Sequence, residues 1–149
     1  MSKYYKDTNN QLFVDPIVEN HTGLTEITKA EFYIIIAPTP AELQTAKLQE
    51  IRIAYNNANQ LDIAYMATTF QADKASQDLI VSVLSAGSVP TGFFWLDKAN
   101  NQVAMTYAQL QALSGAILTR NQTNFIKFQG LKAKVALAKK QADLDLIVW

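Results

Sequence analysis

The residues that could carry chemistry are few and lie far apart in the chain. His21 is the single histidine, and it stands in a polar Asn20-His21-Thr22 stretch. A lone histidine of this kind is more often a surface residue than a general base, and nothing marks a serine or aspartate as its partner. The chain has no cysteine, which excludes disulfides, thiolate metal sites and thiol nucleophiles. We therefore expect no catalytic residue, no metal and no cofactor.

Two pairs of carboxylates are the remaining candidates for acid–base chemistry: Asp73 with Asp78, and Asp143 with Asp145. In each pair the first residue stands where a helix is expected to begin. A carboxylate there accepts the free backbone N–H groups of the first turn and offsets the helix dipole. The five glycines form no phosphate-binding pattern. The residues thus predict a protein that is not an enzyme.

The charge balance argues against nucleic-acid and membrane partners. Thirteen basic and thirteen acidic residues cancel, so no long-range field attracts a phosphate backbone or an anionic membrane. Basic residues do gather near the C-terminus, with Phe125 and Phe128 among them, but we interpret them as a solvated helix face: Lys127, Lys132, Lys134, Lys139 and Lys140. The apolar runs are too short to span a membrane, and the polar start shows no signal peptide.

The first 38 residues are predicted to form a small β-rich module. Segments 3–7 and 11–14 can pair as a hairpin around Thr8-Asn9-Asn10, and 24–27 is a third strand candidate. Thr28 and Glu31 have the spacing of a capping box for a short helix through Ile36. The run 32–36 is so apolar and β-branched that a buried strand is the open alternative.

Residues 39–149 are predicted to form a mainly helical domain. A first helix begins at Pro40, with Thr39 as its N-cap, and runs to about Asn59. One strand, 63–71, follows, and Asp73 caps a second helix that Gly87 ends. The inward positions expected in this second helix are Leu79, Ile80, Val83 and Leu84.

A hairpin and a long helix complete the domain. The hairpin pairs 93–96 with 102–105, and Thr106 with Gln109 spells the capping box of a helix from Tyr107 to about Lys139. Its apolar positions recur at a spacing of 3.5, which suggests a coiled coil with two polar interruptions: Leu110, Leu113, Ile117, Arg120, Asn124, Phe128, Leu131, Val135 and Ala138. The predicted fold class is α+β, a small N-terminal β-hairpin module followed by this helical domain.

Several of these segments, in this order, are typical of one family. They are the helix from Leu43 to Tyr55, Phe70-Gln71-Ala72-Asp73 with Ser76, Trp95-Leu96-Asp97 with Asn101 and Val103, Met105-Thr106, Leu131-Lys132-Ala133, and the closing Leu144 to Trp149. The stretch from Leu43 to Trp149 resembles the C-terminal domain of unknown function found in many phage and prophage tail proteins. The opening, from Tyr4 to Thr28, is similar to that of tail-fibre assembly proteins.

The resemblance implies a non-enzymatic tail protein, either a tail-fibre assembly chaperone or a fibre-associated component. Its partner would be a tail-fibre or other baseplate protein, with a homo-oligomer as a further option. It would act in the host cytoplasm during assembly, and whether it stays in the virion tail is open. The residues expected to contact the partner are Phe93, Trp95, Leu110, Ile117, Arg120, Asn124, Phe128 and Trp149.

A carbohydrate-binding receptor module at the tail tip is the alternative hypothesis. Such a module needs an exposed aromatic platform with amide or carboxylate neighbours. Trp95 with Asn100 and Asn101 is the best local match.

Overall fold

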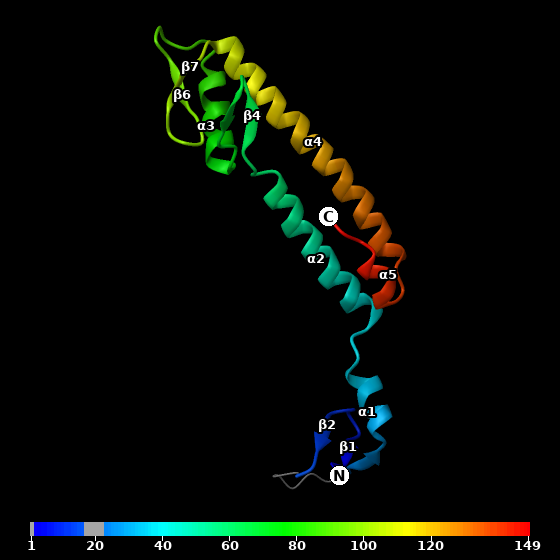
Figure 1. The fold of residues 1–149 in the computed structure, drawn as a ribbon. Helices are drawn as coiled ribbons and strands as arrows, with labels where there is room; N and C mark the ends of the chain where they lie inside the picture. The colour runs from blue at the N-terminus through cyan, green and yellow to red at the C-terminus, as the bar shows by residue number, and fades with distance from the viewer. Residues whose placement is uncertain (1, 17–22) are drawn as a thin grey trace. The chain divides into compact units, whose positions relative to one another are not determined.

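The computed structural model describes residues 2–16 and 23–149 (Figure 1). His21 therefore lies outside the described residues. The chain has an α+β fold and divides into two compact units, Met1–Ala41 and Glu42–Trp149. This division falls three residues beyond the boundary predicted after residue 38.

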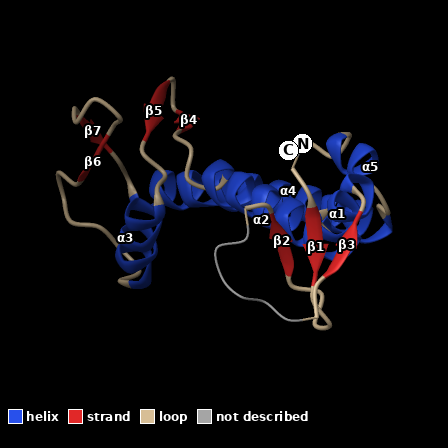
Figure 2. Cartoon of the chain, turned by 90° about the horizontal axis from the view of Figure 1, so that it is seen from below, coloured by secondary structure: helices blue, strands red, loops and turns tan. Residues whose placement is uncertain are grey.

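The first unit contains a three-stranded antiparallel sheet with the order β2-β1-β3 (Figure 2). Its strands are β1 (Tyr4–Lys6), β2 (Leu12–Val14) and β3 (Thr25–Ile27), and in the register Tyr5 lies opposite both Phe13 and Glu26. The β1–β2 turn is held by the Asp7 carboxylate, which accepts the N–H groups of Asn9 and Gln11 at 2.8 Å each. The predicted hairpin and third strand are confirmed.

Helix α1 (Lys29–Ile36) completes the first unit and begins at the predicted capping box. Thr28 Oγ1 accepts the N–H of Glu31, and Glu31 accepts the N–H of Thr28 in return. The strand alternative for 32–36 is therefore wrong, because these residues are helical. The reciprocal hydrogen bonds of Thr28 and Glu31 engage backbone N–H groups at the start of the helix. The ring of Phe32 packs on Tyr4 at 4.7 Å, but none of the eight described residues of α1 is buried, and Ile34 is 74% exposed.

The second unit is built around the long helix α4 (Tyr107–Leu137), with smaller elements packed along it (Figure 1). The elements before α4 are α2 (Pro40–Ala58), β4 (Ile63–Tyr65), β5 (Thr68–Phe70), α3 (Lys74–Ser85), β6 (Phe94–Leu96) and β7 (Gln102–Ala104), and α5 (Gln141–Asp145) follows it. The capping box of Thr106 and Gln109 at the start of α4 is confirmed.

Residues 63–70 form a two-stranded hairpin, and not the single strand that the sequence predicted. Met66 and Ala67 form its turn, both with positive φ, at 51° and 58°. Such a two-residue turn normally carries Asn-Gly or Asp-Gly, because most side chains disfavour the left-handed conformation. Methionine and alanine give no turn signal, so the sequence pattern predicts one continuous strand.

Two hydrophobic clusters lie one after the other along α4. Its N-terminal half packs against α3 and both hairpins around Phe70, Ile80 and Leu110. Its C-terminal half packs against α2 and α5 around Ile51 and other buried residues, which include Phe128, Val135 and Leu144. One predicted inward position is wrong: Leu79 is 56% exposed, because α3 turns only Ile80, Val83 and Leu84 towards the cluster.

Candidate functional site

The carboxylates that could do acid–base chemistry are occupied by local roles. Asp73 is the N-cap of α3, and its Oδ1 accepts the N–H of Ser76 at 2.8 Å, as predicted. Asp78 is ion-paired with Lys74 on the exposed side of the same helix. Among the described residues, no group of three or more His, Cys, Asp or Glu is placed to hold a metal ion.

Asp143 does not have the N-cap position that the sequence predicted. Lys140 is the N-cap of α5 and makes no side-chain capping bond. Asp143 lies in the first turn instead, and its Oδ2 accepts the N–H of Lys139 at 3.1 Å. The carboxylate thus reaches back across the start of the helix, in the manner of the second residue of a capping box.

The inner face of α4, predicted as a possible seam between chains, is filled from within this chain. Leu110, Ile117 and Phe128 are all buried. The first two belong to the cluster with α3 and the hairpins, and Phe128 stacks on Tyr55 of α2 at 4.8 Å. These three predicted contact residues therefore form core and not surface.

The two polar interruptions of that face, Arg120 and Asn124, hold the end of α2. The guanidinium of Arg120 donates to the backbone oxygens of Asn59 and Leu61, just beyond the helix. The Asn124 amide donates to Asn59 Oδ1 at 2.9 Å. Partial burial lowers the pKa of Arg120. Its guanidinium lies at the C-terminal end of α2, where backbone carbonyls have no partner within the helix and accept its hydrogen bonds.

Further amides extend this polar network between the two clusters. The Gln77 amide donates to the carbonyls of Asn59 and Ala72, at 2.8 and 2.7 Å. Its oxygen accepts from Asn121, which itself accepts from Arg120. The network therefore sets the register of α2 and α3 on α4 inside one chain.

Trp149 also packs within its own chain. Its ring meets Tyr55 edge-on at 6.0 Å, and Lys127 Nζ lies 4.6 Å from its centre. It remains only half-buried, at the edge of the second cluster. The sequence predicts Trp149 as a contact with the partner, whereas the structure packs its ring against Tyr55 of its own chain.

The β6–β7 hairpin turns different aromatic residues outwards from those expected. Phe93 and Trp95 pack on each other, 6.2 Å apart, against the first cluster. Phe94 and Leu96 lie on the opposite face and are each 43% exposed. Side chains alternate along a strand, so the run 93–96 had to expose two large apolar residues. The pattern showed the alternation but not which pair would face outwards.

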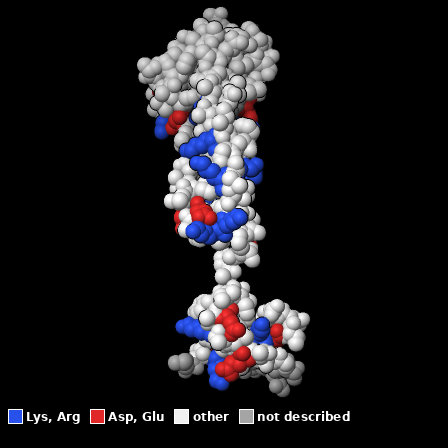
Figure 3. All heavy atoms as spheres, turned by 90° about the vertical axis from the view of Figure 1, so that its right-hand side faces the viewer, with Lys and Arg blue, Asp and Glu red and all other residues white. Residues whose placement is uncertain are grey.

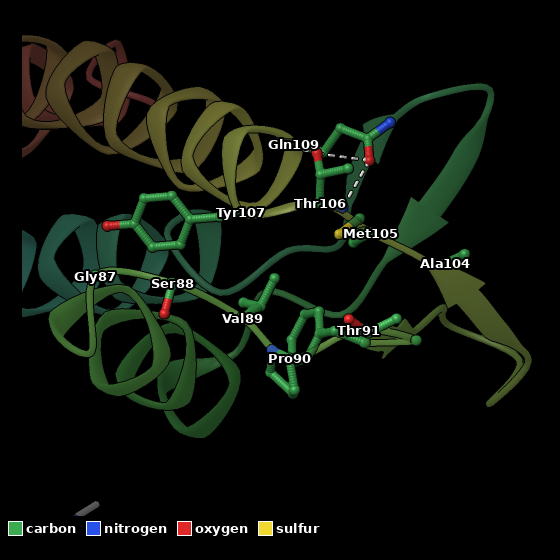
Figure 4. Close-up of a pocket in the computed structure, with 12 residues that line it drawn as sticks. Gly87, Ser88, Val89, Pro90, Thr91, Ala104, Met105, Thr106, Tyr107 and Gln109 are labelled. Atoms are coloured by element: carbon green, nitrogen blue, oxygen red, sulfur yellow. Dashed lines mark hydrogen bonds between the residues drawn. The ribbon is translucent and has the colours of Figure 1, made fainter.

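A cavity of about 530 Å³ opens beside this hairpin, between residues 87–93 and 104–109 (Figure 4). Apolar side chains such as Val89, Pro90 and Met105 form much of its wall, and none of the described lining residues is charged. The Tyr107 hydroxyl donates to the Leu84 carbonyl at 2.9 Å. The cavity can thus accept an apolar or neutral group, but it offers no acid or base.

The amide groups near Trp95 are committed to the hairpin turn. Asn100 has a positive φ of 63°, and Asn101 Nδ2 donates to Asp97 Oδ2 at 3.0 Å. The side-chain and backbone N–H groups of Asn101, with that of Ala99, lower the pKa of the Asp97 carboxyl. The side chains of Asp97 and Asn101 are therefore engaged in shaping the turn.

Comparison with known proteins identifies only the second unit. A family described as "Domain of unknown function (DUF4376)" matches residues 42–148. That description assigns no activity and does not mention tails. No curated protein and no solved structure matches the chain. Within the described residues, no helix is both long and apolar enough to cross a membrane.

Proposed function

We propose that this chain, which belongs to the DUF4376 family, is a non-enzymatic phage tail protein that works through protein–protein contacts. Its role would be that of a tail-fibre assembly chaperone or a fibre-associated component. The observation that supports it most is the hairpin surface, which we define as Phe94, Leu96 and Ala104 with the adjoining cavity of about 530 Å³.

The hairpin surface has the composition of a protein-binding site. Phe94 and Ala104 are cross-strand neighbours, and Ala104 also lines the cavity, so the apolar face leads directly into the hollow. Large apolar side chains that anchor in an uncharged pocket supply most of the free energy of many protein interfaces. An apolar side chain of a partner would fill the cavity without leaving a buried charge unpaired.

Helix α1 supplies a second apolar surface in the first unit. Tyr33, Ile34 and Ile36 are each at least half exposed. A small unit of this kind gains little stability from its own core. Exposed apolar residues such as these are removed from water when a partner protein covers them, which favours binding. We therefore expect the fibre or baseplate partner to contact both units.

The carbohydrate-binding alternative has less support from the geometry. Its platform residue, Trp95, is half-buried and packs towards the first cluster, while a sugar platform needs an open ring face. A glycan array separates the two functions. Reproducible sugar binding that Trp95→Ala abolishes would favour the receptor module and contradict the proposed function.

The proposed function is tested by capture from phage-producing cells, together with analysis of purified virions. We expect the tagged full chain to retain a tail-fibre or baseplate protein, and Phe94→Asp with Leu96→Asp to reduce that retention at least tenfold. Val148→Asp is the matched control, because Val148 is 66% exposed and lies on neither apolar surface. Presence in virions would identify a fibre-associated component, whereas presence only with free fibre protein would identify a chaperone. Retention of no tail protein would contradict the proposal.

A further inference from the structure

The outer face of α4 carries large apolar side chains that nothing in the second unit covers. Leu118, Phe125 and Ile126 are 68%, 50% and 66% exposed. At about 100° per residue, they fall within an arc of about 100°, whose centre is turned by about 110–130° from the buried Ile117 and Phe128. We name the uncharged band that they form the α4 strip: Gly115, Leu118, Gln122, Phe125, Ile126, Gln129, Ala133 and Ala136, all exposed.

The α4 strip contains no charged residue although it lies on a solvated helix. The charged residues of α4 all lie outside it: Arg120, Lys127, Lys132 and Lys134. On the face of the molecule that Figure 3 draws, the charged side chains form separate clusters with uncharged surface between them. Solvent-facing helix positions normally carry charged or polar residues, and the polar residues of this band are Gln122 and Gln129. A long uncharged band with a leucine, a phenylalanine and an isoleucine is therefore typical of a contact surface.

Gly115 leaves room for the close approach of a second helix to the α4 strip. A glycine inside a helix costs about 0.5–1 kcal/mol relative to alanine. A Cβ at Gly115 would meet no atom within 4 Å in its own chain, so no contact of the unit requires the glycine. The same holds for Gly130, which lies off the strip, so Gly115 permits a second helix to pack closely and does not by itself require one.

The order of residues along the strip allows it to pack against the strip of a second copy that runs in the opposite direction. A two-fold axis between Phe125 and Ile126 sets Phe125 opposite Ile126 and Gln122 opposite Gln129 of a second copy. The same axis sets the large Leu118 opposite the small Ala133, and Gly115 opposite Ala136. Isologous contacts of this kind are the commonest in protein oligomers.

From this self-complementarity we propose that the α4 strip is the interface of an antiparallel homodimer, with a second copy of this chain as its occupant. In this arrangement Lys132 of one copy lies opposite Thr119 of the other, so no like charges meet across the interface. The inference does not depend on the tail assignment.

The size of the strip predicts a dimer that dissociates on dilution. From Gly115 to Ala136 the helix extends about 32 Å, so a band about 10 Å wide covers about 320 Å² on each copy, or about 640 Å² in total. That area is smaller than in stable specific complexes and is in the range of weak, transient contacts. We expect a dissociation constant in the micromolar range, so that monomer and dimer are both populated.

Sedimentation equilibrium of the full chain from about 1 to 300 μM tests the dimer. We expect the mass to rise from one chain to two, and Ile126→Glu, next to the two-fold axis, to weaken association at least tenfold. Ile53→Glu is the matched control, since Ile53 is 51% exposed on α2 and its variant should associate like the wild type. Circular dichroism verifies that both variants remain folded. A wild type that stays monomeric throughout, or a dimer that Ile126→Glu leaves intact, would overturn the proposal.

A charge pair tests the antiparallel direction. Leu118→Glu alone should weaken the dimer, because it places an unpaired carboxylate opposite Ala133 of the second copy. Adding Ala133→Lys should restore at least half of the lost association, through a salt bridge between copies; within one chain the two positions are about 22 Å apart. In a parallel dimer the pair would oppose like charges and association would fall further, an outcome that would refute the antiparallel arrangement.

Discussion

The two faces of α4 both carry large apolar side chains but have different surroundings. The inner face holds Leu110, Leu113 and Val135 at 0% exposure, with the network of Arg120 and Asn124 between the two clusters. The outer face holds Leu118, Phe125 and Ile126, each at least half exposed. The comparison teaches that apolar spacing alone does not tell a core face from a contact face. What distinguishes them is the set of elements that pack on each.

The largest effect should come from removing a core side chain of the inner face. Leu113→Ala deletes part of a fully buried side chain and leaves a cavity among α3, α4 and the hairpins. We expect the free energy of unfolding to fall by about 2–5 kcal/mol, measured by urea denaturation below the concentration at which dimer forms.

Leu118→Ala is the matched substitution on the outer face. The same atoms are removed from a side chain that is 68% exposed, so the unfolding free energy of the monomer should change by less than about 0.5 kcal/mol. Equal losses for the two variants would mean that the faces do not differ in burial as described.

A smaller effect should come from the polar network. Replacing Arg120 and Asn124 together by leucine removes the donors to the backbone oxygens of Asn59 and Leu61 and to the Asn59 side chain. We expect a loss of about 1–3 kcal/mol in unfolding free energy, because these partly buried acceptors lose hydrogen bonds.

The same double variant separates two interpretations of these residues. As polar interruptions of a coiled coil, Arg120 and Asn124 would set the register between chains, and leucine at both positions would change the oligomeric state. Since both contact α2 of their own chain, we now expect the dissociation constant of any dimer to change less than threefold. A large change in mass by light scattering, without a loss of unfolding free energy, would instead indicate that these residues lie in an interface between chains.

Much of the fold could be predicted because its signals are local. Two capping boxes, at Thr28 and Thr106, set the starts of α1 and α4, and the 3.5-residue spacing identified the inner face. The β4–β5 hairpin could not be predicted, because Met66 and Ala67 take left-handed conformations that only the tertiary structure stabilises.

The contact surfaces were harder to predict than the elements. Periodicity indicated that Leu110, Ile117 and Phe128 share a face, but not that α2, α3 and the hairpins cover it. The exposure of Phe94 and Leu96 could not be predicted, because strand alternation gives two faces without indicating which one is solvated. Both questions depend on contacts between residues distant in sequence, such as Phe128 with Tyr55.

The smallest effect distinguishes two glycines of α4. Neither Gly115 nor Gly130 has an atom within 4 Å of a built Cβ, so alanine at either position should raise the unfolding free energy of the monomer by about 0.5–1 kcal/mol. Only Gly115 belongs to the α4 strip, and Gly130 lies about a quarter turn away from its centre. Gly115→Ala should therefore weaken the dimer severalfold by adding a methyl group opposite Ala136, while Gly130→Ala leaves the dissociation constant unchanged. Equal effects on association at both positions would place the contact surface elsewhere on the helix.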